Sequence, residues 1–290
     1  MSTKAIFRHE TRATGALQSI DAARPLSLEL NAVTCAFAGA GKRPAYTAVR
    51  DATLTVAQGE FVSVVGPTGC GKSTLLNMAA GLIAPTKGSV SVDGVPLVGL
   101  NRQAGYMFQS DALMPWRSAL ENVAAGLEYR RLPAAECRSQ AMQWLARVGL
   151  TAAADRYPHQ LSGGMRKRVA LAQILALNPR VLLMDEPFSA LDIQTREMME
   201  NELLKLWQQD RKSVMFITHD LGEAIALSDR VVVLSAGPAS HPIGEFEINL
   251  PRPRDVFEVQ HDPRFIELHA EIWQTLKAEV LRAVEWTGAA

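Results

Sequence analysis

The sequence has little of what marks secreted, membrane-spanning or nucleic-acid-binding chains. It has three cysteines in 290 residues and no C-x-x-C pair, so neither a disulfide framework nor a zinc site is predicted. No apolar run approaches the roughly 18–20 residues that cross a bilayer. The N-terminus has scattered basic residues but no apolar core, which argues against a secretory signal. We therefore expect a reducing, cytosolic environment.

A charge excess is also missing. Thirty basic and thirty acidic residues give a formal net charge of zero, which argues against a dedicated nucleic-acid binder. We expect no nucleic-acid partner. The apolar share, 48%, is that of a globular protein, and the length suits one core with accessory pieces.

The stretch Gly66–Thr74, GPTGCGKST, matches the pattern G-x-x-x-x-G-K-[ST]. An apolar run, Phe61–Val65, precedes it and a helical pattern follows it, which is the strand–loop–helix context of a phosphate-binding loop. Glycines let backbone N–H groups surround an anion, and the helix N-terminus adds its positive dipole end. A glycine-rich turn with a chance Lys-Ser pair is the alternative, and the flanking pattern disfavours it.

Within this loop, Lys72 supplies a mobile positive charge for the terminal phosphates, and Ser73 offers a hydroxyl to Mg²⁺. We expect the whole loop to contact the nucleotide: Gly66, Pro67, Thr68, Gly69, Cys70, Gly71, Lys72, Ser73 and Thr74.

A second stretch supplies groups for hydrolysis. The apolar run Val181–Met184 ends at Asp185 and Glu186, and the carboxyl end of a strand is where an α/β sheet places its ligands. Asp185 would hold Mg²⁺ through water, and Glu186 would polarise the attacking water as a general base. An ordinary surface Asp-Glu pair is the alternative, and the upstream phosphate loop weakens it.

A third stretch, Leu161–Met165, places Ser-Gly-Gly at the start of a helix, which is a second anion-binding N-terminus. One triphosphate needs two such sites only where two chains share it. The pattern therefore points to a nucleotide bound between two copies.

The rest of the sequence predicts an ordered set of elements. Alternating or continuous apolar patterns predict strands, and strands alternating with helices in the second half argue for a parallel α/β sheet. The early strands look antiparallel. On the helix predicted at 195–209, we expect Met198, Leu203, Leu206 and Trp207 on or near one face. The predicted strands are 26–37, 47–56, 61–65, 90–94, 181–184, 213–218 and 230–234, and the predicted helices are 120–131, 134–148, 163–177, 195–209, 223–227 and 262–284.

Over residues 26–234 the chain resembles the nucleotide-binding subunits of ATP-binding-cassette (ABC) transporters. Leu161–Met165 is similar to their signature sequence, and the phosphate loop, Gln109, Asp185-Glu186, Ser189–Asp192 and His219 stand in the family order. The resemblance implies a P-loop NTPase fold of ABC type, an α/β fold with a mixed sheet core, an antiparallel β subdomain and a helical subdomain. It divides the chain into a flexible extension (1–25), a nucleotide-binding domain (26–245, helical subdomain about 111–160) and a C-terminal helical extension (246–290).

The resemblance also implies roles in ATP hydrolysis. Gln109 would join Ser73 and Asp185 on Mg²⁺, Glu186 would be the catalytic base, and His219 would contact the terminal phosphate. Ser162, Gly163 and Gly164 would close over the ATP of a second copy, and Asp192 would link the two sites across that homodimer. An aromatic residue would stack on adenine, and Phe37 is our choice, with Tyr46 as the alternative.

The wider strings LSGGMRKRVA, LDIQTR and LPRPRD look like the nitrate/sulfonate/taurine importer branch. Met165 is ordinary there, and Lys167 is expected to leave the catalytic set untouched. The implied protein is a peripheral ATPase on the cytoplasmic face of the inner membrane, bound to permease subunits and served indirectly by an extracytoplasmic solute-binding protein. Short permease helices would dock near 109–120, at exposed Leu113–Trp116, unless those residues serve local packing. A soluble ABC-type ATPase not coupled to transport is the alternative function.

Overall fold

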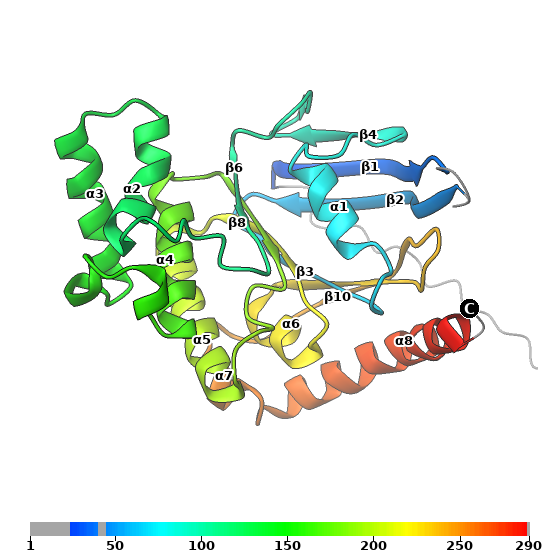
Figure 1. Ribbon diagram of the computed structural model, residues 1–290. Helices are drawn as coiled ribbons and strands as arrows, with labels where there is room; N and C mark the ends of the chain where they lie inside the picture. The colour runs from blue at the N-terminus through cyan, green and yellow to red at the C-terminus, as the bar shows by residue number, and fades with distance from the viewer. Residues whose placement is uncertain (1–23, 40–44, 289–290) are drawn as a thin grey trace, which may run out of the picture.

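A computed structural model describes residues 24–39 and 45–288 (Figure 1). The extension predicted for 1–25 lies almost wholly outside the described residues. The described chain forms two sheets with helices around them, and the predicted mixed sheet, antiparallel sheet and helical block are all present. Among the described residues, no helix combines the length and the apolar character that crossing a bilayer demands.

The four-stranded sheet is antiparallel and has the order β2-β1-β4-β5. The predicted antiparallel pairing of the early strands is therefore correct. Its two long strands run side by side over their full length, with Leu26 opposite Ala57 and Phe37 opposite Tyr46. The strands are β1 (Leu26–Phe37), β2 (Tyr46–Ala57), β4 (Lys87–Val92) and β5 (Val95–Pro96).

The six-stranded sheet has the order β10-β9-β3-β8-β7-β6, and all of its pairs are parallel except β10 with β9. Three central strands, β3, β8 and β9, are buried at every position, and their largely apolar sequences are typical of a parallel sheet covered on both faces. The strands are β3 (Phe61–Val65), β6 (Ala104–Met107), β7 (Val181–Asp185), β8 (Ser213–Ile217), β9 (Arg230–Leu234) and β10 (Pro242–Glu247).

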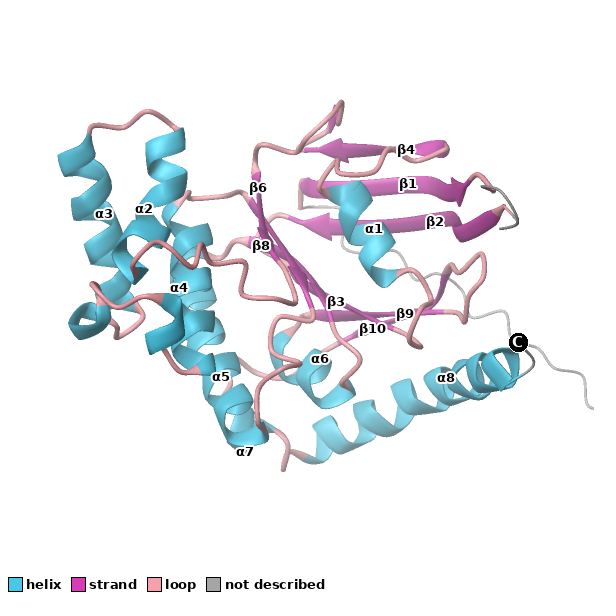
Figure 2. Ribbon diagram, viewed as in Figure 1, coloured by secondary structure: helices cyan, strands magenta, loops and turns pink. Residues whose placement is uncertain are grey.

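Each face of the six-stranded sheet has its own core. Alternate residues such as Val62, Val64 and Ile217 face α1 (Lys72–Ala79) and the antiparallel sheet. The intervening residues, such as Phe61 and Phe216, face the other helices, and Trp207 packs edge-on against Phe61 there. Figure 2 shows α1 on the side of the antiparallel sheet and α4 and α5 on the other side.

The helical block predicted at about 111–160 is present, with α2 and α3 packed on α4. A capping box starts α2, since Ser118 and Glu121 each bond the other's backbone N–H. The helices on this side are α2 (Ala119–Tyr129), α3 (Ala134–Arg147), α4 (Gly163–Ala176), α5 (Ile193–Asp210) and α6 (Leu221–Leu227), with short 3₁₀ turns at Thr151–Ala153 and Pro158–Gln160.

One helix-face expectation is wrong. Leu203, Leu206 and Trp207 of α5 are buried, but Met198 is 66% exposed and its neighbour Met199 takes the inward position. Met199 and Leu203 are four residues apart and therefore lie on the same face of the helix. Met198 is rotated from Met199 by about 100° around the helix axis and so points away from that face.

The C-terminal part adds a strand that the sequence analysis did not identify. β10 pairs with β9, so the predicted domain boundary at 245 falls within a strand of the main sheet. Beyond it, Arg254 donates hydrogen bonds to the carbonyls of Ile225, Ala226, Ser228, Ile248 and Leu250. Two helices follow, α7 (Val256–Val259) and α8 (Pro263–Gly288), and α8 packs on α6, β9 and β10.

Candidate functional site

The loop Gly66–Thr74 joins the central strand β3 to α1, as the sequence pattern predicts. Gly71 is the residue before α1 and has a φ of 100°, a conformation that side chains with a Cβ disfavour. A Cβ there would lie 2.9 Å from Val49 Cγ2, so β2 also closes the space. Glycine at this position thus lets the chain turn sharply into the helix, whose N-terminus faces the loop.

The Lys72 ammonium lies inside the loop. Its Nζ donates to the carbonyl oxygens of Gly66 (2.8 Å) and Pro67 (3.0 Å), and the residue is only 6% exposed. A lysine ammonium has three donors, so one remains to meet an incoming phosphate. The loop therefore combines a fixed cation with the positive end of a helix, which is a site for a polyphosphate.

Oxygen donors for a divalent cation stand beside the loop. Ser73 Oγ donates to Asp185 Oδ1 at 3.0 Å, which joins the start of α1 to the end of β7. Burial raises the pKa of Asp185, and hydrogen bonds from Ser73 and Tyr106 oppose that rise. No group of three or more His, Cys, Asp or Glu side chains suited to a metal occurs in the described chain. A few hard oxygens that leave most positions to phosphate and water fit Mg²⁺.

The predicted base and the predicted phosphate-contacting histidine touch each other. Glu186 Oε2 lies 3.1 Å from His219 Nδ1, across the ends of neighbouring strands β7 and β8. Glu186 itself has a φ of 43°, which turns the chain directly after the strand. The two side chains are 23% and 54% exposed, so both remain open to a substrate.

Ser189 connects this pair to Gln109. Its hydroxyl donates to the Glu186 carbonyl at 3.0 Å and accepts from Gln109 Nε2 at 3.3 Å. Because the amide nitrogen of Gln109 is engaged, its oxygen is the atom left for a cation. Ser189 was not among the predicted site residues, although it begins the Ser189–Asp192 motif that the sequence displays.

Lys167 contacts one of the predicted catalytic residues, Gln109, through the backbone of that residue. Its Nζ donates to the Gln109 carbonyl at 2.7 Å and pairs with Asp111 Oδ1 at 3.0 Å, while the residue is 2% exposed. Arg166 binds the other oxygen of Asp111. These contacts fasten the Gln109 segment to α4.

The Ser-Gly-Gly turn starts α4, with Ser162 Oγ accepting from the Met165 N–H at 3.3 Å. A Cβ on Gly164 would lie 2.8 Å from Thr195 Cγ2, so the turn packs closely on the first turn of α5. Asp192 caps α5, and the N–H of Thr195 lowers the pKa of this exposed carboxyl. Among the described residues, no hydrogen bond joins Ser162–Gly164 to the phosphate loop, and α4 and α1 pack on opposite faces of the sheet.

The two aromatic candidates stand opposite each other at one end of the antiparallel sheet. Phe37 and Tyr46 are 44% and 36% exposed and are paired across β1 and β2. A Cβ on Gly237 would lie 3.6 Å from the Tyr46 hydroxyl and 3.3 Å from the Gly69 carbonyl. The structure thus brings Tyr46 near the phosphate loop, and Phe37 stays a prediction.

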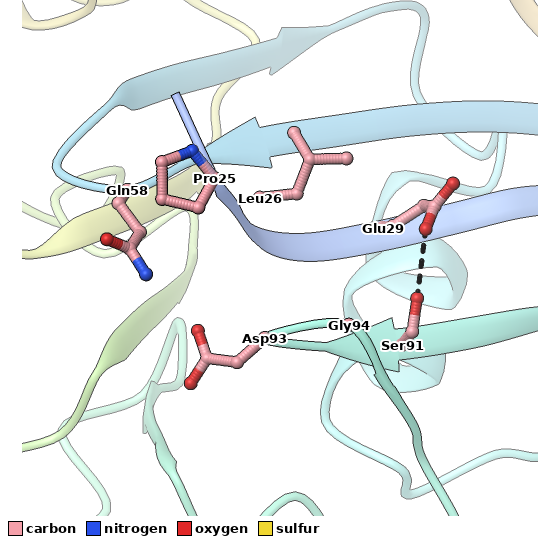
Figure 3. A pocket seen from close by; sticks show the side chains of 7 residues that line it. All are labelled: Pro25, Leu26, Glu29, Gln58, Ser91, Asp93 and Gly94. Carbon is pink, nitrogen blue, oxygen red and sulfur yellow. Dashed lines mark hydrogen bonds between the residues drawn. The ribbon is translucent and has the colours of Figure 1, made fainter. Parts of the chain in front are cut away.

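A separate pocket of about 240 Å³ lies at the other end of β1 (Figure 3). Glu29 accepts a hydrogen bond from the Ser91 hydroxyl on its wall. It contains none of the predicted site residues, and its lining is Pro25, Leu26, Glu29, Gln58, Ser91, Asp93 and Gly94.

Residues 49–189 match a family model described as ABC transporter. The chain is 47% identical to an uncharacterized ABC transporter ATP-binding protein of Methanocaldococcus jannaschii, over 82% of this chain and 87% of that protein. It is 46% identical to the nitrate import ATP-binding protein NrtD of Synechococcus elongatus (79% and 84% covered). It is 45% identical to the bicarbonate transport ATP-binding protein CmpD of Synechocystis sp. (77% and 80% covered).

Solved structures with the same fold include the ATP-binding cassette MJ0796 in a dimeric post-hydrolysis state bound to ADP and Pi. The TM-score is 0.68 and the identity 34%, over 77% of this chain and 100% of that one. The cbiO1 structure from Clostridium perfringens, part of the ABC transporter complex cbiONQ, has a TM-score of 0.69 at 24% identity, over 84% and 94%. Because the sequence identity is only 24%, the similarity to cbiO1 supports the fold and nothing about function.

Proposed function

The chain belongs to the ABC transporter family, and we propose that it is the ATP-hydrolysing subunit of an importer for a small anionic solute. The family and the cassette bound to ADP and Pi identify the chain as an ATPase. The observation that carries the importer proposal is the similarity over about four fifths of the chain to proteins of nitrate import and bicarbonate transport. Nitrate, bicarbonate, sulfonates and taurine are the candidate solutes.

In the proposed reaction the phosphate loop and Lys72 bind the triphosphate. Mg²⁺, when bound, neutralises the charge that develops on the phosphates, and Ser73, Gln109 and Asp185 are the residues that would hold it. Glu186 accepts a proton from the attacking water, and His219, already within hydrogen-bond distance of Glu186, contacts the terminal phosphate.

A second copy completes the site. The Ser162–Gly164 turn and the phosphate loop pack on opposite faces of the sheet, so one chain does not close both over one nucleotide. Two copies related by a twofold axis would each lend this turn to the other's ATP, with Asp192 near the shared interface. ATP then favours the closed dimer, and hydrolysis removes the bridge.

Permease subunits are the proposed membrane partners, and they would hold the protein at the cytoplasmic face. Trp116 is 73% exposed and follows an exposed proline, which supports docking at this point. Leu113, expected to be exposed, packs against the core instead, so the docking surface is limited to the residues after it. A solute-binding protein would deliver the solute to the permease.

The test is recovery of the partners from gently solubilised native membranes. We expect a tagged chain to bring down a polytopic permease, and Trp116→Ala to bring down less of it while hydrolysing ATP normally alone. Tyr129→Ala, a change at an even more exposed aromatic residue (90%) of the same subdomain, is the matched control. Recovery of soluble partners only would favour the alternative, an ABC-type ATPase not coupled to transport.

The solute is then identified by reconstitution. ATP hydrolysis by the complex in vesicles is measured with the companion binding protein and nitrate, bicarbonate, taurine or an alkyl sulfonate. Stimulation by one of these solutes supports the proposal. Stimulation only by a solute that carries no anionic group contradicts it.

A further inference from the structure

A buried acidic cluster that the proposed chemistry does not use lies between α5 and α6, next to His219. Glu200 of α5 and Glu223 of α6 are 3% and 7% exposed. Carboxyl groups are rarely buried to this degree unless they are paired with a cation or hydrogen-bonded. The bonds that stabilise these two buried carboxyl groups therefore also affect the segment between β8 and α6, which contains His219.

Glu223 controls the backbone on both sides of His219. The Thr218 hydroxyl donates to Glu223 Oε2 and accepts from the backbone N–H of Asp220 at 3.0 Å. The backbone N–H of Glu223 in turn donates to Asp220 Oδ1 at 3.1 Å. Because these bonds fix the residues before and after His219, they set the direction in which its half-exposed ring points.

The two buried carboxyl groups need a proton between them. Glu200 and Glu223 face each other across the contact between α5 and α6 and act on each other's ionisation, and ionised carboxylates can only accept hydrogen bonds. Glu223 Oε1 is buried and finds no donor among the described residues. One proton shared by the pair supplies the missing donor, as in other close carboxyl pairs.

The neighbouring charged groups do not replace the shared proton between Glu200 and Glu223. The Arg196 guanidinium lies 3.7 Å from Asp220 Oδ2 and donates to the Leu191 carbonyl at 3.2 Å. Its positive charge favours ionisation of both carboxyl groups, but burial outweighs this effect. The negative charge of Asp220 acts on both carboxyl groups and that of Glu197 acts on Glu200, and both charges oppose ionisation.

We propose that Glu223 is a positioning residue for His219, and that it acts as one half of a proton-sharing pair with Glu200. The Thr218–Glu223 bond holds the His219 backbone while the pair keeps its proton. Loss of the proton leaves two negative charges facing each other in a buried site. Their repulsion displaces the Glu223 carboxylate from Thr218, although a hydroxyl donates more strongly to a charged carboxylate than to a neutral one. The inference rests on the proposed role of His219 in hydrolysis.

Burial is the main reason that the pair keeps its proton. It raises the pKa of Glu223, and the facing Glu200 raises it further. Burial likewise raises the pKa of Glu200 above the ordinary value of 4.5. The pair therefore stays protonated at pH values where an exposed glutamate is ionised. Its effect on activity should appear on the alkaline side of the pH profile, where the pair loses its proton.

The first experiment is the pH profile of kcat and KM for ATP, measured on the full chain. We expect wild-type kcat to decline on the alkaline side, and the decline to be weaker in Glu223→Gln and Glu200→Gln, whose amides stay uncharged. Thr218→Val, which removes the hydroxyl but keeps the shape, should lower kcat about ten- to a hundredfold with little change in KM. Glu202→Gln, on the same helix outside the cluster, should follow the wild-type profile.

An unchanged alkaline decline in both glutamine variants would overturn the proposal, as would wild-type kcat in Thr218→Val. His219→Ala separates this from the proposed function. If His219→Ala keeps wild-type kcat, the role of His219 fails, and the pH dependence of folding then decides whether the pair shares a proton.

That second readout is urea unfolding between pH 4 and 9. With folded pKa values above 4.5, the folded chain keeps protons that the unfolded chain loses, so the unfolding free energy falls as pH rises past 4.5. The fall should be smaller in Glu200→Gln and Glu223→Gln. An identical pH dependence in wild type and both variants would contradict proton sharing.

Discussion

At the residue scale, the groups proposed for hydrolysis are held in place by hydrogen bonds to one another. Glu186 is bonded to His219 through its side chain and to Ser189 through its carbonyl, and Ser189 is bonded to Gln109. The base is therefore oriented from two sides. Such prior orientation lowers the entropic cost of reaching the reactive geometry.

Replacing the base should separate binding from hydrolysis. Glu186→Gln keeps the shape and a hydrogen-bonding group for His219 but cannot take a proton, so we expect turnover to fall roughly 10²–10⁴-fold while ATP still binds. Steady-state hydrolysis and equilibrium binding of ATP measure the two effects. Lys72→Ala is the contrasting variant, since it should weaken binding itself. Wild-type hydrolysis by Glu186→Gln would remove Glu186 from the base role.

The residues that the sequence identifies are those whose chemistry fixes their type and spacing. Lys72, Ser73, Asp185 and His219 belong to short motifs, and the structure brings Ser73 to Asp185 and His219 to Glu186. The bond of Lys167 to Gln109 joins positions 58 residues apart, which no local pattern encodes. Contacts of this kind depend on how α4 packs, and only the fold reveals them.

At the element scale, Arg254 fastens the segment after β10 to the end of α6. Its guanidinium bonds five backbone carbonyls, and the residue is 8% exposed. Burial lowers its pKa to about 10. The last carbonyls of a helix have no partner within the helix, so this side chain supplies donors that the α6 end lacks.

Removing this side chain should destabilise the fold. In Arg254→Met the stem is kept and the donors are lost, which leaves several buried carbonyls unpaired. We expect the unfolding free energy to fall by about 3–5 kcal/mol in urea titrations. Arg264→Met, which breaks only an exposed pair with Glu267, should change it by less than about 1 kcal/mol. Equal effects of the two changes would contradict this account of Arg254.

The missed strand β10 shows where pattern reasoning fails at this scale. Pro242 and Gly244 both weaken a strand pattern, and the exposed and half-buried positions of β10 alternate without one fully buried residue. β10 forms because β9 offers it an antiparallel edge. By contrast, β3, β8 and β9 each have four apolar residues out of five, and their bounds were predicted within one residue.

At the scale of the whole molecule, the two halves of the proposed site lie on different faces of one sheet. This arrangement predicts complementation between two inactive variants. Lys72→Ala damages the phosphate loop and Ser162→Arg damages the signature turn, so each should be inactive alone. In a mixed dimer one site has an intact loop from one copy and an intact turn from the other. An equal mixture should therefore recover about a quarter of wild-type ATPase activity.

The measurement is ATP hydrolysis at fixed total protein after mixing and equilibration. Mixing Lys72→Ala with Glu186→Gln is the control, because both changes damage the half of the site that carries the phosphate loop. A mixed dimer of these two variants therefore contains no intact site. No recovery with Ser162→Arg, although the proteins form mixed dimers, would show that each chain completes its own site.

The strand order has a consequence for how the protein is made. β3, which carries the phosphate loop, lies between β8 and β9, whose residues follow it in the chain by about 150 positions or more. A ribosome adds about 5–20 residues each second, so about 8–30 seconds pass between the synthesis of β3 and that of β8 and β9. The phosphate loop is thus synthesised first among the motifs but reaches its folded conformation among the last. We expect a chain truncated before β9 to lose nucleotide binding although every residue of the loop is present.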